Sequence, residues 1–357
     1  MKKKMIAILL CAVCLLSGCS EIYRGSYSTV KPHVQVQTPV VPQTLTAKNM
    51  QELRGHIEKM IDGGKEDGVI YVDGYDLSKV QTDMEKICNN ISRDYPVAAF
   101  ALEGISFELG KRDGRPALSL VIRYTRSRAE LLGIRNAANM DMATLQICNA
   151  MARCDVSVVL HVTDYEELDY LQIVENYAME NPNLVMEVPR VSWEVYPQQG
   201  KSRVLEVFFT YQTSRDSLKS MQEKVEPVFA SAVLYVSGDA GEREKYSQLY
   251  SFLMERYDYK FDTSITPTYS LLRHGVGDSR AFAVVYAAMC RQAGLECIVV
   301  SGTKDAESRY WNIICRDDTY YHVDLLSGNY RERKDQQMEG YVWDYSAYPA
   351  CTGKPVE

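Results

Sequence analysis

Three side chains in the C-terminal third of the chain could support hydrolysis or acyl transfer: Ser279, His322 and Asp324. His322 and Asp324 are two residues apart in a stretch typical of a strand, so both side chains should share one face of it. A hydroxyl, an imidazole and a carboxylate that meet in the fold are the parts of a nucleophilic triad. Ser279 also has a simpler interpretation. It follows Asp278 at the start of a helical pattern, and either residue suits a helix N-cap.

The elements that must position these side chains are a buried helix and the strands that follow it. Apolar residues recur at helical spacing over 282–293, and Gly294 stands where such a helix would end. Both flanks of this pattern are apolar too, which predicts a central, buried helix. Residues 295–300 then indicate a strand, and 310–316 and 319–325 indicate a hairpin.

This order of elements, with several short motifs, resembles the transglutaminase-like superfamily, which has a papain-like architecture. The motifs are an Ala-Gly-Leu helix end, a Tyr-Trp-Asn strand segment and a Tyr-His-Val-Asp segment, at residues 293–295, 310–312 and 321–324. The tail at 340–351 also looks like the endings of bacterial members. The resemblance covers residues 240–351 and implies a central helix packed on an antiparallel sheet.

The resemblance also implies a catalytic Cys, His and Asp, and this chain departs from two of them. Ser279, or Gly277 in an alternative alignment, stands where the family has its Cys, and Arg309 replaces the His. Asp324 keeps the family residue, while Cys290 lies about three turns into the helix and is no substitute. The family nucleophile is a thiolate activated by a His. A serine hydroxyl is not ionised near neutral pH, and Arg, with a pKa above about 12, cannot act as its base.

We therefore expect a degenerate site without catalytic residues, in which Arg309 and Asp324 form an ion pair in place of the family's His–Asp pair. Arg suits a two-pronged contact with a carboxylate, and neighbouring strands would place the two side by side. The enzymatic alternative is an atypical hydrolase or acyltransferase with Ser279 as nucleophile, His322 as base and Asp324 as its partner.

Tyrosine is unusually abundant, with 25 residues against 8 Phe and 3 Trp. Fourteen of these tyrosines lie between Tyr235 and Tyr348, in the region of the degenerate site. Tyr has an apolar face and a polar tip, so we expect aromatic residues around the former cleft to bind a peptide or glycan. The candidates are Tyr310, Trp311, Tyr320 and Tyr321. The simpler interpretation is that these residues only build a β-rich domain, since Tyr favours strands.

The N-terminus has the features of a bacterial lipoprotein signal. Lysines at 2–4 precede an apolar run at 5–16, which is shorter than the roughly 20 residues needed to cross a bilayer. The Leu-Ser-Gly-Cys sequence at 16–19 resembles a lipobox, which implies cleavage before Cys19 and a lipid that holds the protein outward-facing on the cell membrane. The alternative is an ordinary secretory signal with a chance Cys. Residues 20–48 contain three Pro and many Ser, Thr and Gln, which is typical of an extended tether.

The middle of the chain contains an internal repeat, in which residues 105–131 align with 191–218. Each copy predicts a helix, a strand, a second helix and a hairpin, and a third partial copy begins at Leu218 with 232–236 as its strand. The fold class is therefore α+β, with two small repeats before a papain-like domain. The expected parts are a signal peptide (1–18), a lipidated Cys with its tether (19–48), two repeats (49–139 and 140–235) and the transglutaminase-like domain (236–357).

Composition narrows the functional classes. The 357 residues are 46% hydrophobic and 24% charged, as in ordinary globular proteins, and the net charge is −7. This acidic balance argues against binding to nucleic acid. Because His and Cys are not clustered, and the acidic run at 164–169 suits a helix start, we expect neither a metal nor a cofactor. The seven cysteines after Cys19 read as buried core residues; one disulfide is possible, but no pair is indicated.

These features predict a non-catalytic binding or scaffolding protein at the bacterial cell envelope. Its partner would be a cell-wall peptide, a glycan or another protein, and its contact with the membrane would be the lipid on Cys19. A solute-binding lipoprotein of a transporter fits less well, because the repeat and the family resemblance disagree with the two-lobed α/β fold of such proteins.

Overall fold

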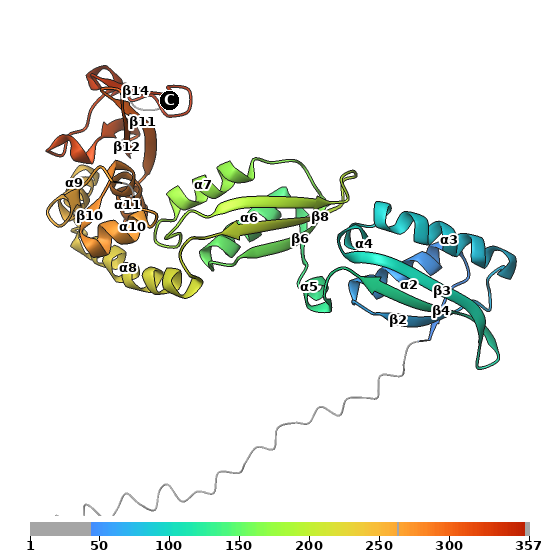
Figure 1. The fold of residues 1–357 in the computed structure, drawn as a ribbon. Helices are drawn as coiled ribbons and strands as arrows, with labels where there is room; N and C mark the ends of the chain where they lie inside the picture. The colour runs from blue at the N-terminus through green and yellow to red at the C-terminus, as the bar shows by residue number, and fades with distance from the viewer. Residues whose placement is uncertain (1–43, 263, 354–357) are drawn as a thin grey trace, which may run out of the picture. The chain divides into compact units, whose positions relative to one another are not determined.

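The computed structural model of the protein describes residues 44–262 and 264–353. The predicted signal peptide, Cys19 and most of the predicted tether lie outside these residues. The described part is a mixture of helices and sheets, including three four-stranded sheets, which confirms the predicted α+β class (Figure 1). No helix within it is long and apolar enough to cross a membrane.

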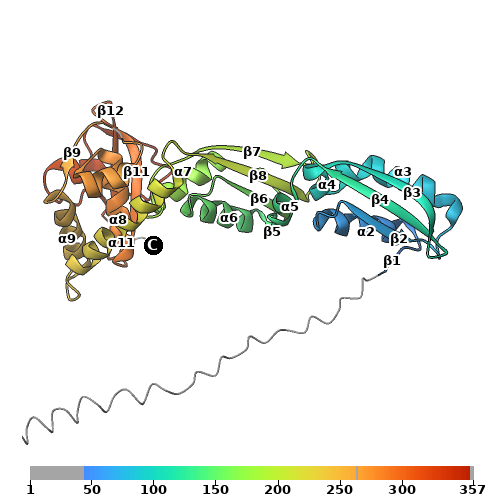
Figure 2. The same ribbon diagram turned by 60° about the horizontal axis from the view of Figure 1, so that its bottom comes forward.

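The first sheet has the strand order β1-β2-β4-β3, with antiparallel pairing of β4 to both β2 and β3. In β4, Leu118 and Leu120 are buried whereas Val121 is 50% exposed, so one face of the sheet is covered and the other is open. Helices α2 and α3 provide the cover (Figure 2). The elements are β1 (Leu45–Thr46), α2 (Met50–Asp62), β2 (Asp67–Tyr71), α3 (Leu77–Asp94), α4 (Pro96–Ala101), β3 (Leu102–Arg112), β4 (Arg115–Tyr124) and α5 (Arg128–Leu132).

The second sheet has the order β5-β6-β8-β7, which is the same succession as in the first. Helices α6 and α7 pack against it and share one apolar core with its strands. The elements are β5 (Arg135–Asn139), α6 (Met140–Ala152), β6 (Ser157–Asp164), α7 (Tyr170–Glu180), β7 (Arg190–Tyr196) and β8 (Arg203–Thr210). Strand β5 precedes the boundary placed at residue 139, so the second sheet takes in residues that the sequence assigned to the first repeat.

Corresponding helices in these two parts begin at the same residue types. The N-cap pairs are Asn49 and Asn139, Asp76 and Asp169, and Ser127 and Ser214. Each side chain accepts a backbone N–H from the first turn of its helix, a donor that has no partner within the helix. The helix, strand, helix and hairpin expected in each copy are present in both parts.

The third partial copy predicted from Leu218 is absent, because that segment forms the long helix α8 (Arg215–Tyr235). The residues predicted as a strand, 232–236, are the end of this helix and its C-cap. A short apolar run such as this one does not distinguish a buried helix from a strand by itself. Here the helical spacing of Val225, Phe229 and Ala232 decides, since it places all three in the core of the C-terminal part.

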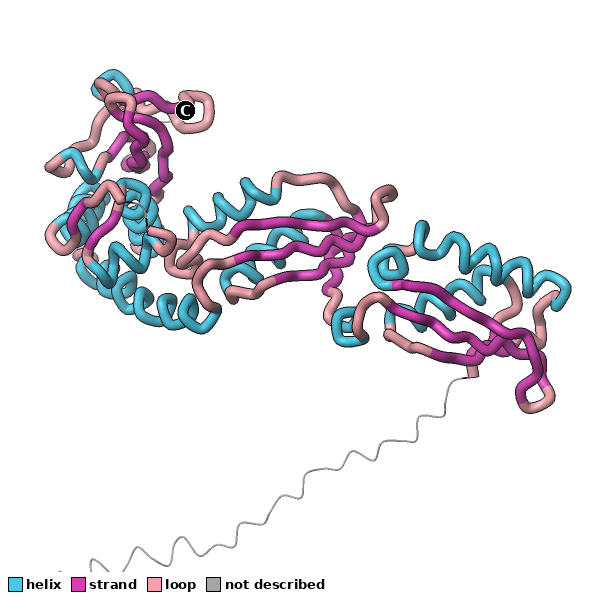
Figure 3. The backbone as a smooth tube through the Cα atoms, in the orientation of Figure 1, coloured by secondary structure: helices cyan, strands magenta, loops and turns pink. Residues whose placement is uncertain are grey.

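The C-terminal part combines helices with a sheet of order β13-β12-β11-β14 (Figure 3). Strand β12 lies between β11 and β13, antiparallel to both, as the predicted hairpin requires. The remaining elements are α9 (Glu242–Met254), β9 (Asp258–Tyr259), α10 (Pro267–Tyr269), a π-helix (Ser270–His274), β10 (Val276–Gly277), α11 (Ser279–Gln292), β11 (Cys297–Lys304), β12 (Glu307–Arg316), β13 (Thr319–Val323), two 3-10 turns (Leu325–Ser327 and Asp335–Gln337) and β14 (Tyr341–Trp343).

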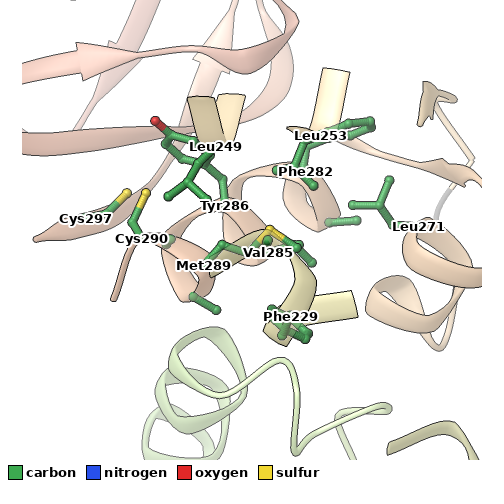
Figure 4. Packing of buried hydrophobic residues seen from close by; sticks show 14 of the residues in the cluster. Phe229, Leu249, Leu253, Leu271, Phe282, Val285, Tyr286, Met289, Cys290 and Cys297 are labelled. Atoms are coloured by element: carbon green, nitrogen blue, oxygen red, sulfur yellow. The ribbon is translucent and has the colours of Figure 1, made fainter. Parts of the chain in front are cut away.

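Helix α11 is the centre of this part, as predicted. Every residue from Ala281 to Cys290 is buried, on all faces of the helix. Tyr286, Val285 and Met289 pack among side chains from α8, α9 and β11 (Figure 4). The start of the helix is thereby held against β12, where the family resemblance places its chemistry.

Candidate functional site

The start of α11 is occupied by two oxygens that accept backbone N–H groups. The Asp278 carboxylate accepts the N–H of Ala281 at 2.8 Å and caps the helix, which confirms the simpler interpretation of this segment. The Ser279 hydroxyl oxygen accepts the N–H of Tyr310 on β12 at 3.2 Å, and Ser279 is buried. The serine therefore links the helix start to the neighbouring strand.

Ser279 is the better of the two candidate positions for the family's nucleophile. A Cβ atom at Gly277 would lie 3.0 Å from the Cβ of Ala281 and 3.1 Å from Cδ1 of Leu271. Contacts this short are tight, and a side chain here would require Ala281 or Leu271 to move by a few tenths of an ångström. The alignment that places the nucleophile at residue 277 is therefore disfavoured, and the residue found at the favoured position is a serine.

Arg309 and Asp324 form the expected ion pair. The guanidinium of Arg309 on β12 donates from Nε to Oδ2 at 3.1 Å and from Nη2 to Oδ1 and Oδ2 at 3.0 and 2.8 Å. The side chains are only 13% and 1% exposed. Such a forked, charge-assisted contact is among the strongest polar contacts that proteins make. The place of a His–Asp pair is thus held by a buried Arg–Asp pair.

The remaining lone pairs of Asp324 are also used. Its Oδ1 accepts the N–H of Leu326 at 2.9 Å, and its Oδ2 accepts the hydroxyl of Tyr341 at 2.6 Å. Burial and this hydrogen bond raise the pKa of Tyr341 to about 12, so the hydroxyl keeps its proton at neutral pH and acts as the donor. The carboxylate is thereby enclosed by donors from three elements.

The structure contradicts the alternative triad of Ser279, His322 and Asp324. His322 is fully buried, and both of its ring nitrogens have other partners. Nδ1 accepts the indole N–H of Trp311 at 3.0 Å, which leaves the ring hydrogen on Nε2, and Nε2 donates to Asp335 at 2.9 Å. The alternation of side chains along a strand indicates which face His322 points to. It does not indicate its partners, Trp311 and Asp335, which belong to other elements. His322 therefore cannot take a proton from the serine without breaking one of these bonds.

His322, Asp335 and Cys351 form a compact group, with their potential ligand atoms within 4.8 Å of one another. A metal on Nε2 would displace the ring hydrogen to Nδ1, where it would oppose the N–H of Trp311. Burial also raises the pKa of Cys351 to about 12, so without a metal its thiol is protonated at neutral pH. The group fits a hydrogen-bonded core better than a metal centre.

The four aromatic residues predicted to bind a ligand lie in different environments. Trp311 is fully buried in the core, so its prediction as a ligand contact is wrong: its indole packs against Tyr341 and Trp343. Tyr310 and Tyr320 are half-buried at other points of the sheet, and the hydroxyl of Tyr320 donates to Glu296. Tyr321 lines an open groove, to which the sequence did not point.

This groove, which we call the basic groove, has a volume of about 560 Å³. Its ten lining residues include four cations, two acids and three tyrosines. They are Arg243, Lys304, Tyr321, Tyr330, Arg331, Glu332, Arg333, Gln337, Glu339 and Tyr341. Because Tyr341 also bonds Asp324, one residue joins the wall of the groove to the buried ion pair.

A second hollow, of about 290 Å³, is lined mainly by apolar residues from the end of α7, from segments between α7 and α11, and from the start of α11. Its lining includes Met186, Val188, Ile265 and Arg280, but not Ser279, Arg309 or Asp324. The buried acid in its wall, Glu187, already accepts the N–H groups of Gln212 and Thr213. The two neighbours of Ser279, Asp278 and Arg280, line this hollow, so it borders the start of α11, although its lining does not include the Arg309–Asp324 pair.

The cations of the basic groove were not predicted from the sequence. Lys304 ends β11, whereas Arg331 and Arg333 lie in the loop that follows β13, about 30 residues later. The available signal was the charged run Arg331-Glu332-Arg333-Lys334. Such a run usually indicates a solvated face, and only the fold shows which surface it forms.

Comparisons with known proteins found one family model and several solved structures. Residues 231–344 match the model of the family described as the transglutaminase-like superfamily. One similar solved structure is described as a TGase, with 10% identity, a TM-score of 0.27, and coverage of 64% of this chain and 68% of that one. Another is a candidate protease from Parabacteroides distasonis, with 10% identity, a TM-score of 0.25, and coverage of 63% and 36%. No curated protein sequence matched the chain.

Proposed function

Because residues 231–344 form a transglutaminase-like domain, we propose that this domain has lost its catalytic function and serves as a binding or scaffolding module. We further propose that a lipid on Cys19 holds the protein on the outer face of a bacterial cell membrane. There it would bind a cell-wall peptide, a glycan or another protein.

The observation that carries the proposal is the ion pair between Arg309 and Asp324. An active site of this family needs a base beside its nucleophile, and an arginine with a pKa above about 12 cannot accept a proton near neutral pH. The imidazole of the alternative triad, His322, is bonded on both nitrogens. Ser279 thus has a hydrogen-bonded place in the fold, and neither Arg309 nor His322 is free to activate it.

Reversion of the two positions tests the loss of function. The double variant Ser279→Cys, Arg309→His restores the family's thiol and imidazole, so it should gain thiol-dependent hydrolysis or amine incorporation on peptide substrates. Wild type and the Ser279→Ala variant should both be inactive. The matched control is Ser301→Cys, which places a thiol on an exposed part of β11 and should gain nothing. Turnover by wild type that Ser279→Ala abolishes would contradict the proposal.

The membrane anchor is tested separately, since Cys19 lies outside the described residues. Cells fed an alkyne-bearing fatty acid should label the wild-type protein but not the Cys19→Ala variant. The control is Cys14→Ala, which changes a cysteine within the apolar run and should still be labelled. Equal labelling of wild type and Cys19→Ala would contradict lipidation at this residue.

We also propose that the two parts built on the first and second sheets, residues 45–124 and 135–210, are two copies of one unit, which act as spacers between the tether and the C-terminal domain. The shared strand order and the matched helix caps support this. Limited proteolysis tests the division. The first cleavage should fall between the sheets, at residues 125–134, whereas a first cleavage within either sheet would count against it.

A further inference from the structure

We propose that the basic groove binds an oxyanion with at least two negative charges, supplied by phosphate or carboxylate groups. This inference rests on the proposed binding function and gives it a site and a ligand class. The site consists of Lys304, Arg331 and Arg333 around Tyr341.

The charges of the groove are unbalanced. Of its two acids, Glu332 is already engaged by Arg316 at 3.1 Å and by Arg243 at 3.6 Å, and its other contact is the hydroxyl of Tyr330 at 3.0 Å. Across residues 44–262 and 264–353, Lys304, Arg331 and Arg333 form no ion pair. Three uncompensated cations in one hollow are unusual in a chain with a net charge of −7.

Two of these cations are held close to one tyrosine. The ammonium of Lys304 lies 5.2 Å from the ring centroid of Tyr341, a cation–π distance. Arg333 is near enough to oppose the rise in the pKa of the same tyrosine. The backbone of Arg333 is fixed as well, since it exchanges hydrogen bonds with His322 at 2.8 and 2.9 Å. The groove is therefore built on ordered backbone rather than on a free surface loop.

The chemistry of the walls indicates the ligand class. Guanidinium groups bind phosphate and carboxylate through paired N–H donors, and an ammonium adds a point charge. Within the described part of the chain, the groove has three unpaired cations and one unpaired acid, Glu339. This excess of positive charge suits a ligand with more than one negative charge. Tyr321 and Tyr330 would offer ring faces to the uncharged part of such a ligand.

Calorimetric titration of the full-length protein with pyrophosphate, citrate and acetate at equal ionic strength tests this proposal. Pyrophosphate, citrate or both should bind saturably, and acetate should not. The stronger of the two identifies phosphate or carboxylate as the source of charge. Binding should weaken as salt is added, because exposed charges are screened over about 8 Å at physiological ionic strength. Failure of both pyrophosphate and citrate to bind would overturn the proposal.

A pair of substitutions locates the site. Lys304→Gln with Arg333→Gln should weaken binding by about tenfold or more, since each removes a charge-assisted hydrogen bond. The matched control is Arg190→Gln with Lys224→Gln, which removes the same charge from exposed positions on β7 and α8. The milder Arg331→Gln should weaken binding without affecting the fold, since this residue is exposed. Equal affinities of the groove and control variants would overturn the proposal, but would leave the proposed loss of catalysis untouched, because that test measures turnover.

An independent observation concerns two buried thiols. We infer that Cys290 and Cys297 are a pair that can close into a disulfide between the end of α11 and the start of β11. Both are buried in the core, and their sulfur atoms point toward each other (Figure 4). The two thiols also interact directly, which contributes to the raised pKa of Cys290, although burial is the larger cause. Each of the seven cysteines in the described part is a free thiol in this structure.

The reaction requires a disulfide reagent as oxidant. The two S–H bonds break and one S–S bond forms, while two electrons and two protons reduce the disulfide of the reagent to two thiols. Because both thiols are buried, the reaction is expected during folding and not in the folded chain.

Refolding in a buffer of oxidised and reduced glutathione, followed by alkylation and peptide mapping, tests this pair. The peptides of Cys290 and Cys297 should appear linked and lighter by two hydrogen atoms, and Cys290→Ala should leave Cys297 alkylated. Cys148→Ala is the control and should not change the linkage. Full alkylation of both residues, or a linkage between other cysteines, would overturn the inference.

Discussion

The buried ion pair and the basic groove meet at Tyr341 but have opposite electrostatic character. At the ion pair, every polar atom of Asp324 has a donor from within the chain, and the guanidinium of Arg309 is paired with it. In the groove, Lys304, Arg331 and Arg333 have no paired acid among the described residues. The polar groups of the first region are thus already bonded within the chain, whereas the three cations of the second are the ones to which we assign a ligand.

The two proposals together describe a fold in which one site has decayed while the surface beside it binds a ligand. A buried charge is tolerated only when it is paired and hydrogen-bonded, and Arg309 supplies that partner to the Asp324 carboxylate. Exposed cations carry no such requirement, because water solvates them. Substitutions should therefore affect stability at the ion pair and binding at the groove.

The largest effect is expected from Arg309→Met, which leaves the Asp324 carboxylate buried without its cation. Loss of one partner of a buried pair costs about 3–5 kcal/mol, so the free energy of unfolding in urea should fall by that amount. Adding Asp324→Leu should recover part of the loss. The control is Arg115→Met, which breaks the exposed pair with Asp73 and should leave the urea midpoint nearly unchanged. Equal losses in the two single variants would contradict the comparison.

Trp311→Phe should cost about 2–3 kcal/mol, because it leaves Nδ1 of His322 without its donor and opens space in the core. The control is Trp193→Phe, since Trp193 is 39% exposed and should be less costly to change. Chemical denaturation measures both. If Trp311→Phe costs no more than Trp193→Phe, the indole does not hold the imidazole in place.

Tyr341→Phe removes the hydroxyl that bonds Asp324 and leaves the ring in the groove. Stability should fall by about 1.5 kcal/mol, the value of a hydrogen bond to a charged group, while oxyanion affinity should change by less than about twofold. Tyr345→Phe, at an exposed position, should change neither quantity. A large loss of affinity in Tyr341→Phe would show that the two regions are coupled rather than separate.

The smallest expected effect is on pH dependence. Burial lowers the pKa of His322 and outweighs the opposing effect of Asp335, so the folded state binds its proton less readily than the unfolded state. The contribution of His322 is complete above the unfolded pKa of about 6.5 and is lost as the pH falls towards the lower folded pKa. The decline in unfolding free energy between pH 6.5 and pH 5 should thus be shallower in His322→Asn than in wild type.

His161 provides the comparison, because burial lowers its pKa too but the residue is less buried than His322. The His161→Asn variant should flatten the decline less than His322→Asn does. An unchanged slope in His322→Asn would contradict a neutral, buried imidazole.

Local sequence patterns predicted the helices and strands of the C-terminal part, and the family resemblance predicted the ion pair. Neither predicted the basic groove. The spacing of Phe282 to Ala293 and the glycine at 294 were sufficient for α11, because helical periodicity and a left-handed C-terminal glycine are local signals. Arg309 and Asp324 followed from the family alignment and from strands that pair as neighbours.

The misses have a common physical origin, since each depended on partners that are distant in sequence. His322 was expected to face the same side of its strand as Asp324 and to act with it. Its ring nitrogens instead form hydrogen bonds with the indole of Trp311 and the carboxylate of Asp335. Trp311 was predicted to contact a ligand, but it is fully buried and packs against Trp343 of β14. The excess of tyrosine is likewise explained in part by the core, where the hydroxyl of Tyr246 donates to two backbone carbonyls.

The most direct test of the lost catalytic function is the reaction of the wild-type protein with a serine-reactive phosphonate probe, followed by mass spectrometry of the peptide that contains Ser279. Since Arg309 is paired with Asp324 and His322 is bonded on both nitrogens, neither activates Ser279, which should remain unmodified, and wild type and Ser279→Ala should be labelled equally little. Labelling of wild type at Ser279 that is absent from Ser279→Ala would show an activated nucleophile and contradict the account.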